Sequence, residues 1–267
     1  MASAAAPVSR FDLGRVVERT FASIGRNFAV FLMLTILLAG VPAILTGLLL
    51  NLAGIGPAGL AASANSRQLF AMGAAGSGFA TLVGAIASFI LQAAVVYGTI
   101  ADLNGRRAVF SECLSTGLRS WFWIFLLAIV VGIAEVFGFL LLIVPGVMMA
   151  VAWVVAVPAL VVERTGVFGA MSRSAELTRG HRWPIFGLLV IYLIAAAIIS
   201  SMVSVVVGAA AVSVSAGVTQ PALQLIAQPL VSIITKLISS AGVASIYFEL
   251  RSTREGIGPE ALAAVFD

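Results

Sequence analysis

The sequence predicts an all-α, polytopic membrane protein with six transmembrane helices in three hairpins and with cytoplasmic amphipathic helices. Hydrophobic residues make up 61% of the 267 residues and charged residues only 10%, whereas soluble globular proteins have roughly 45–50% and about 25%. The apolar residues form long uninterrupted runs, which are typical of spanning helices and not of the alternating strands of outer-membrane barrels. The basic residues lie in short segments that flank these runs, as expected for a chain oriented in a membrane.

Six apolar runs are candidates for spanning helices, each of which needs about 20 residues. They are Phe28–Leu50, Phe79–Ile100, Trp121–Ile143, Val147–Val162, Trp183–Val207 and Pro229–Leu250. The third and fourth runs are nearly continuous, and a single helix of that length would be roughly twice as long as the hydrocarbon layer is thick. The sequence VPGV at Val144–Val147 predicts a tight hairpin between them, because proline removes a backbone donor and glycine permits a turn.

The distribution of basic residues predicts the orientation of the chain. Thirteen of the fifteen Lys and Arg residues fall on one side: Arg10, Arg15, Arg19, Arg26, Arg106, Arg107, Arg119, Arg164, Arg173, Arg179, Arg182, Arg251 and Arg254. Arg67 alone lies on the other side, and Lys236 lies inside a run. The positive-inside rule then places both termini and both basic loops in the cytoplasm, which predicts a multi-pass membrane protein.

The chain is expected to form a single integral membrane domain over residues 1–267. Within it, residues 1–27 are a cytoplasmic amphipathic N-terminus, residues 28–250 a six-helix bundle and residues 251–267 a cytoplasmic tail. No cleaved targeting peptide is expected, because the first apolar run is longer than the roughly 7–15 residues of a signal-peptide core.

A short amphipathic segment that ends in a basic residue and an aromatic one precedes the first, third and fifth runs, at residues 11–28, 109–121 and 167–183. On a helix, Arg15, Arg19 and Arg26 of the first segment fall within an arc of about 40°, opposite an apolar face. Such a helix can lie in the headgroup layer, where each basic residue contributes roughly 1 kcal/mol. We therefore expect Arg15, Arg19, Arg26, Arg179 and Arg182 to contact lipid headgroups. The alternative is a helix packed on the cytoplasmic ends of its neighbours.

Two ionisable residues, Glu135 and Lys236, lie inside the apolar runs. Each costs roughly 2.5–3.5 kcal/mol at the bilayer centre. At about 1.5 Å per residue both lie roughly 20 Å from the cytoplasmic boundary, so they are at the same depth. We predict an ion pair between them and contact between the third and sixth helices, because pairing offsets much of the desolvation cost. The pair could fix the helix register or form part of a proton or substrate path.

The motifs predict no catalytic, cofactor-binding or metal site. The sequence GIGPAG at Gly54–Gly59 matches a dinucleotide-binding string, but no strand precedes it and it lies on the outer side. One histidine, His181, and one cysteine, Cys113, exclude a zinc site or a Cys/His catalytic pair. Cys113 is expected to be a reduced thiol. The basic residues are dispersed beside apolar runs, which argues against a nucleic-acid partner.

A further pattern lies in residues 141–188 and in the closing sequence YFELRSTREG. It consists of the Pro145-Gly146 pair, the sequence PALVVE ending in Glu163, Arg173 with Ser174, and the sequence LTRG of Leu177–Gly180. In these residues the chain resembles a bacterial inner-membrane family, the membrane domain of glycerophosphoryl diester phosphodiesterases and related uncharacterised membrane proteins. The resemblance covers roughly residues 11–256 and implies a fold and a location. It implies no catalytic residue, because phosphodiesterase chemistry uses histidines and clustered acids with a divalent metal.

Together these observations predict a non-enzymatic integral inner-membrane protein. Its expected partners are membrane lipids, and another membrane protein or a second copy of the chain. Its expected role is in lipid or envelope homeostasis, or as a scaffold. The alternative is a small transporter or permease subunit that uses Glu135 and Lys236, together with helices bent by proline.

Overall fold

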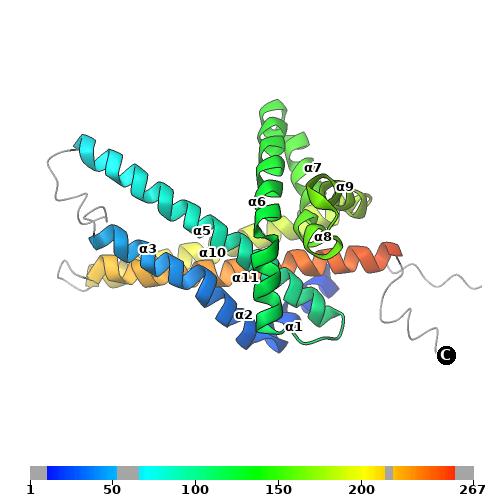
Figure 1. Ribbon diagram of the computed structural model, residues 1–267, viewed down its shortest axis with the longest axis horizontal. Coiled ribbons are helices and arrows are strands. Elements are labelled where there is room, and N and C mark those ends of the chain that lie inside the picture. Colours follow the sequence, from blue (N-terminus) through cyan, green and yellow to red (C-terminus); the bar gives the residue numbers. More distant parts are fainter. Residues whose placement is uncertain (1–10, 53–65, 214–218, 256–267) are drawn as a thin grey trace, which may run out of the picture.

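The computed structural model describes residues 11–52, 66–213 and 219–255, and these residues are almost entirely helical (Figure 1). The described helices are α1 (Leu13–Arg26), α2 (Phe28–Thr35), the π-helix η1 (Ile36–Gly40), α3 (Val41–Leu52), α5 (Ser66–Leu103), α6 (Phe110–Leu141), α7 (Ile143–Trp153), α8 (Ala156–Glu163), α9 (Gly166–Thr178), α10 (Arg182–Ser213) and α11 (Thr219–Glu255). No strand occurs in the described ranges. The prediction of an all-α chain is confirmed.

Six helical segments within the described ranges are long and apolar enough to cross a membrane, which confirms the predicted number of spans. They are Phe28–Thr46, Thr81–Leu103, Phe110–Leu141, Ile143–Glu163, Arg182–Val206 and Val231–Glu255. The second and sixth lie within α5 and α11, the longest helices described. The sixth helix continues to Glu255, so the first residues of the predicted tail belong to it.

The first span is not a regular α-helix, because α2 and α3 are joined by the π-helix η1. Pro42 lies in the first turn of α3. Proline has no N–H, and its ring clashes with the carbonyl four residues earlier, which here belongs to Leu38 within η1. A wider turn before the proline relieves that clash, so α2, η1 and α3 remain one continuous span.

The break between α6 and α7 lies at Leu142, slightly earlier than the predicted turn at Val144–Val147. Leu142 is extended, with φ −166° and ψ 148°, and Pro145 already belongs to the first turn of α7, where its missing N–H needs no partner. Gly146 has a different role from the one predicted. A Cβ there would lie 2.6 Å from the ring of Phe139, and one at Gly138 would lie 3.1 Å from the Gly146 Cα. The two glycines therefore permit close contact between α6 and α7.

Helix α5 is the centre of the arrangement, since it packs on both α6 and α11 and also on α1, α3 and α8. Figure 1 shows α3, α5, α10 and α11 running in broadly one direction, with α6 standing across them and α7, α8 and α9 gathered beside α6. The main apolar core joins residues of α5, α7, α8 and α11, such as Val96, Val151, Ala159 and Tyr247. By contrast, α10 packs on α11 at the periphery and buries only Ile185 among its residues of described burial.

We term one end of the bundle the basic end. It is formed by α1, α9, the C-terminal ends of α5, α8 and α11, and the N-terminal ends of α6 and α10. Side-chain contacts link these parts: Arg15 with Glu249, Arg26 with Asp102, Tyr97 with Glu112, Arg173 with Glu163 and Glu255, and Phe11 with His181. Residues that precede three of the six spans therefore contact residues at the ends of the other three spans.

The crossing of α5 and α6 depends on Gly117, and this generates a stability prediction. In Gly117→Ala the new Cβ would lie 2.6 Å from the backbone oxygen of Ile90. A backbone atom cannot move aside as a side chain can, so we expect a loss of about 1–3 kcal/mol of stability. The measurement is the melting temperature of the purified protein in detergent.

Gly132→Ala, on the same helix, is the matched control, because a Cβ at Gly132 meets nothing within 4 Å. Alanine is the better helix former, so this variant should melt at the same temperature or slightly higher. Equal melting temperatures for the two variants would mean that α5 and α6 do not cross at Gly117.

Candidate functional site

The polar groups of the basic end form three separate clusters, each of which contains a carboxylate from the end of a spanning helix. The first cluster is centred on Glu249 of α11, which is fully buried. Arg15 Nη1 lies 3.1 Å from Glu249 Oε1, and Arg19 Nη1 binds Oε2. The Arg19 guanidinium also lies 5.2 Å from the ring centroid of Phe248. These contacts dock α1 along α11 with its arginines turned inward.

The second cluster joins the end of α1 to the connection between α5 and α6. Arg26 binds Asp102 through two contacts, Nη2 to Oδ2 at 2.5 Å and Nε to Oδ1 at 3.2 Å. This hydrogen bond raises the pKa of Arg26. Asn27 donates to Asp102 Oδ1 at 2.7 Å and accepts from the Ala108 N–H at 3.0 Å. The cluster therefore fixes the start of the first span against the ends of the second and third.

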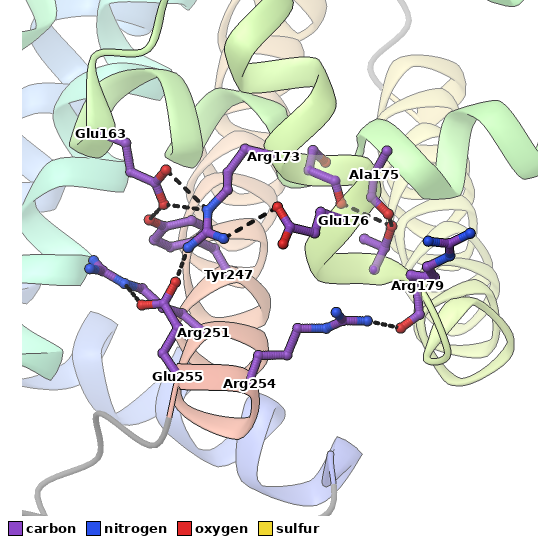
Figure 2. A network of polar contacts seen from close by, with 11 residues as sticks. Glu163, Arg173, Ala175, Glu176, Arg179, Tyr247, Arg251, Arg254 and Glu255 are labelled. Carbon is purple, nitrogen blue, oxygen red and sulfur yellow. Dashed lines mark hydrogen bonds and ion pairs between the residues drawn. The ribbon is translucent and has the colours of Figure 1, made fainter.

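The third cluster links α8, α9 and α11 and is drawn in Figure 2. Glu163 accepts a hydrogen bond from the Tyr247 hydroxyl at 2.7 Å and two from Arg173 Nε at 3.0 and 3.1 Å. Arg173 also binds Glu255, which in turn accepts from Arg251 Nε at 2.8 Å. Burial alone would lower the pKa of Arg173, but the hydrogen bonds and charge of Glu163 outweigh it and raise the pKa.

The five arginines predicted to contact headgroups fall into two groups. Arg15, Arg19 and Arg26 bind carboxylates of other helices, so they follow the alternative of a segment packed on its neighbours. Arg179 and Arg182 have no carboxylate partner in the described part of the chain. The Arg179 carbonyl accepts a hydrogen bond from Arg254 (Figure 2), and the Arg182 Nε is buried without a partner among the described residues.

The sequence analysis missed the acidic partners, although a signal for them was present. Asp102, Glu163 and Glu249 each lie in or next to the last turn of a span that ends beside a basic segment. An acid at that position is dehydrated by the neighbouring helices and so needs a cation close by. The predicted orientation already placed arginines at the same level. The predicted orientation could not show which arginine binds which acid.

His181 and Cys113 have structural roles at this end. The rings of His181 and Phe11 lie 5.5 Å apart, which connects the start of α10 with the chain before α1. Burial, followed by the charge of Arg254, lowers the pKa of His181, so the ring is neutral at pH 7. Cys113 is a free and fully buried thiol.

The predicted ion pair between Glu135 and Lys236 is not formed in the described part of the chain. The Lys236 Nζ donates instead to the Ser88 hydroxyl of α5 at 2.6 Å. Glu135 is half-buried and makes no ion pair or hydrogen bond with the described residues. The physical reason lies in the packing, because α5 lies between α6 and α11 and is the principal neighbour of both.

Lys236 borders a polar cavity of about 210 Å³ between α5, α10 and α11. Its polar walls are Ser88, Gln92, Tyr192, Ser239 and Ser240. The Ser88 hydroxyl donates to the Gly84 carbonyl at 2.6 Å, so its oxygen is left to accept from the lysine. An ammonium group has three donors, and a ligand with acceptor oxygens in the cavity could take the other two.

The described residues contain no group of three or more His, Cys, Asp or Glu side chains that could hold a metal ion. The chain matches no protein-family model, and no similar protein was found among curated proteins or solved structures. The resemblance to the membrane domain of glycerophosphoryl diester phosphodiesterases stays a prediction. Functional roles are therefore argued from the geometry of the clusters and cavities.

Removal of the Glu249 charge tests whether that residue holds α1 in place. Glu249→Gln would leave Arg15 and Arg19 without a counter-charge, so we expect about 2 kcal/mol less stability for the docked helix. Hydrogen exchange of the α1 amides should accelerate, while exchange in α8 should not change. Arg19→Gln in the same chain should restore part of the protection, because fewer uncompensated charges remain.

Glu18→Gln is the matched control, since Glu18 is exposed on α1. If α1 exchanges at the same rate in wild type and in Glu249→Gln, the carboxylate does not dock the helix.

Proposed function

We propose that this chain is a non-enzymatic integral protein of the bacterial inner membrane with both termini in the cytoplasm. We propose further that its basic end engages lipids of the cytoplasmic leaflet. The orientation is supported by the basic residues, thirteen of fifteen of which flank the spans on one side. The location is supported by the six apolar helices. A role in lipid or envelope homeostasis or as a scaffold, with lipids or another membrane protein as partners, fits this position.

The observation that carries the proposal is the orientation of α1 about its own axis. Arg15 and Arg19 point inward to Glu249, whereas Leu13, Val17 and Phe21 are 36%, 43% and 56% exposed. A helix in water would normally show the reverse, with its apolar side chains covered. An apolar face left open beside the end of a membrane bundle is typical of a helix in the interfacial layer, where that face enters the acyl region.

An apolar groove of about 330 Å³ continues from this face between α1, α10 and α11. Val17 and Phe21 line it from α1, and Ile191, Ala195 and Ile238 from the two spanning helices. We assign it to one acyl chain of a membrane phospholipid. On the other face of α1, Arg15 and Arg19 share the single carboxylate of Glu249. This leaves excess positive charge on the helix, which favours an anionic lipid.

The finer organisation of the chain belongs to the same proposal. Three hairpins, each preceded by an amphipathic segment, would place the three basic segments side by side at the cytoplasmic surface. The contacts of α6 with α7 and of α10 with α11 support two of these hairpins. The pattern ending in Glu163 and the residues Arg173 and Ser174 also support kinship with the membrane domain of glycerophosphoryl diester phosphodiesterases, without their catalytic chemistry.

The depth of α1 in the bilayer tests the proposed function. Val17→Cys and Phe21→Cys can be labelled selectively with an environment-sensitive fluorophore, because the native Cys113 is fully buried. In vesicles of phosphatidylcholine and phosphatidylglycerol, lipids brominated on the acyl chain should quench both labels strongly.

Glu18→Cys, an exposed polar position about 100° around the same helix from Val17, is the matched control and should be quenched less than the label at position 17. Equal quenching at all three positions, or none at positions 17 and 21, would contradict an interfacial α1.

A second candidate function is a small transporter or permease subunit, and the Lys236 cavity is the observation that favours it. Intramembrane charges usually face a water-filled path or another charge, and Lys236 has no carboxylate partner among the described residues. Glu135 does not line this cavity, so a path through the cavity would use Lys236 and not Glu135.

Thiol accessibility distinguishes the two functions. A transporter predicts that Gln92→Cys and Ser239→Cys react with a small charged, water-soluble thiol reagent, because a thiolate forms only where water enters. Ile198→Cys, on the exposed face of α10, is the matched control and should stay unreactive in lipid. If Gln92→Cys and Ser239→Cys were as unreactive as Ile198→Cys, a hydrated path would be excluded.

A further inference from the structure

A second polar cavity, of about 360 Å³, opens at the basic end between α6, α8 and α9. Its α6 wall carries two series of residues spaced four apart, which places them on one helix face. The residues are Ser115, Arg119 and Trp123 in one series and Thr116 and Ser120 in the other. Arg164, at the end of α8, and Gly166, the first residue of α9, complete the polar wall. The cavity therefore combines two cations with three hydroxyl groups.

The two arginines of this cavity differ from most others at the basic end. Arg15, Arg19, Arg26, Arg106, Arg173 and Arg251 each contact a carboxylate. The side chains of Arg119 and Arg164 make no ion pair or hydrogen bond with any described residue, although both border the same cavity. Two cations that face one space repel each other unless an anion lies between them. The cavity thus lacks the negative charge that the three clusters possess.

The backbone around Arg164 is also adapted to the cavity. Arg164 adopts the left-handed conformation, with φ 53°, and is the one non-glycine residue with positive φ among those described. This conformation is unfavourable for arginine, so it is retained against a local cost. Gly166 follows with φ 76°, and a Cβ there would meet nothing within 4 Å. Helix α9 has 13 residues and receives no side-chain cap from Thr165, so the positive end of its dipole borders open space.

We propose that this cavity binds the phosphate group of a phosphate ester, with Arg119 and Arg164 as its charged ligands. Guanidinium groups bind phosphate oxygens through paired N–H donors. The hydroxyls of Thr116 and Ser120 can donate to the remaining oxygens, and the start of α9 favours negative charge. The Ser115 hydroxyl donates to the Glu112 carbonyl at 3.0 Å and so only lines the wall.

The ester could belong to a lipid headgroup or to a soluble molecule such as glycerol 3-phosphate, since both present the same group. Trp123 is 51% exposed at the edge of the cavity. Tryptophan is enriched at the level of lipid headgroups. A cavity at that level can be reached both by a lipid headgroup and by a soluble phosphate ester. The site involves neither α1 nor Lys236, so it can exist whether or not the function proposed above is correct.

The test uses the full-length protein in a neutral detergent and two probes. Glycerol 3-phosphate, measured by titration calorimetry, represents the soluble ester. Dioctanoyl phosphatidic acid, measured by native mass spectrometry, represents the headgroup, with dioctanoylglycerol as the phosphate-free control. Each of Arg119→Gln and Arg164→Asn should weaken binding about tenfold, and the double variant more, because each removes charge-assisted hydrogen bonds.

Two features keep the test independent of folding. Asparagine tolerates the left-handed conformation better than most residues, so Arg164→Asn removes the cation without added backbone strain. Arg107→Gln removes an exposed arginine that does not line the cavity and should bind both probes like wild type.

Binding of glycerol 3-phosphate that depends on both arginines supports a site for soluble esters. Binding of phosphatidic acid alone with the same dependence supports a headgroup site. If neither probe binds, or if Arg107→Gln weakens binding as much as the cavity variants, the proposal is overturned. Either result leaves the labelling of α1 unaffected, so the two proposals fail separately.

Discussion

Carboxylates at the ends of spanning helices hold this protein together at its basic end. Asp102 and Glu249 bind arginines that stand far away in the sequence, and Glu163 binds Arg173 of the next helix. A carboxylate removed from water is costly without a partner, and breaking such a pair is more costly than the pair is stabilising. The positions of α1 and α9 therefore follow from these acids. The apolar face of α1 is uncovered as a direct consequence, because its arginines point into the protein.

Within the membrane-spanning part, small residues set the geometry. Lipid tails are as apolar as leucine, so helices gain little from hiding hydrophobic side chains from lipid and depend on close packing. Gly117 allows α6 to touch the backbone of α5, and Gly138 with Gly146 brings α6 and α7 together. In the peripheral α10, a Cβ at Gly187 would meet nothing within 4 Å, and large side chains such as Ile191 and Met202 are exposed. The apolar groove beside α1 lies where that loosely covered helix meets α11.

The charges left without partners mark the places where ligands can bind. Arg15, Arg19, Arg26, Arg106, Arg173 and Arg251 are each neutralised by an acid, so they serve the architecture. Lys236, Arg119 and Arg164 are not neutralised by any described residue, and all three line cavities with polar walls. Glu135 also has no ion-pair partner among the described residues, but it lines neither of these two cavities.

The sequence alone determined the helical class and the number of apolar helices long enough to span a membrane, because hydropathy and length are properties of contiguous residues. It predicted that Glu135 and Lys236 lie at the same depth in the membrane, but depth does not decide which helices are neighbours. Only the tertiary structure put α5 between α6 and α11, joined Arg19 to Glu249 and opened the cavity beside Arg119. These contacts depend on which helix faces meet, and glycine contacts and buried ion pairs decide that. The ion pairs between α1 and α11 join residues that are more than two hundred positions apart in the sequence.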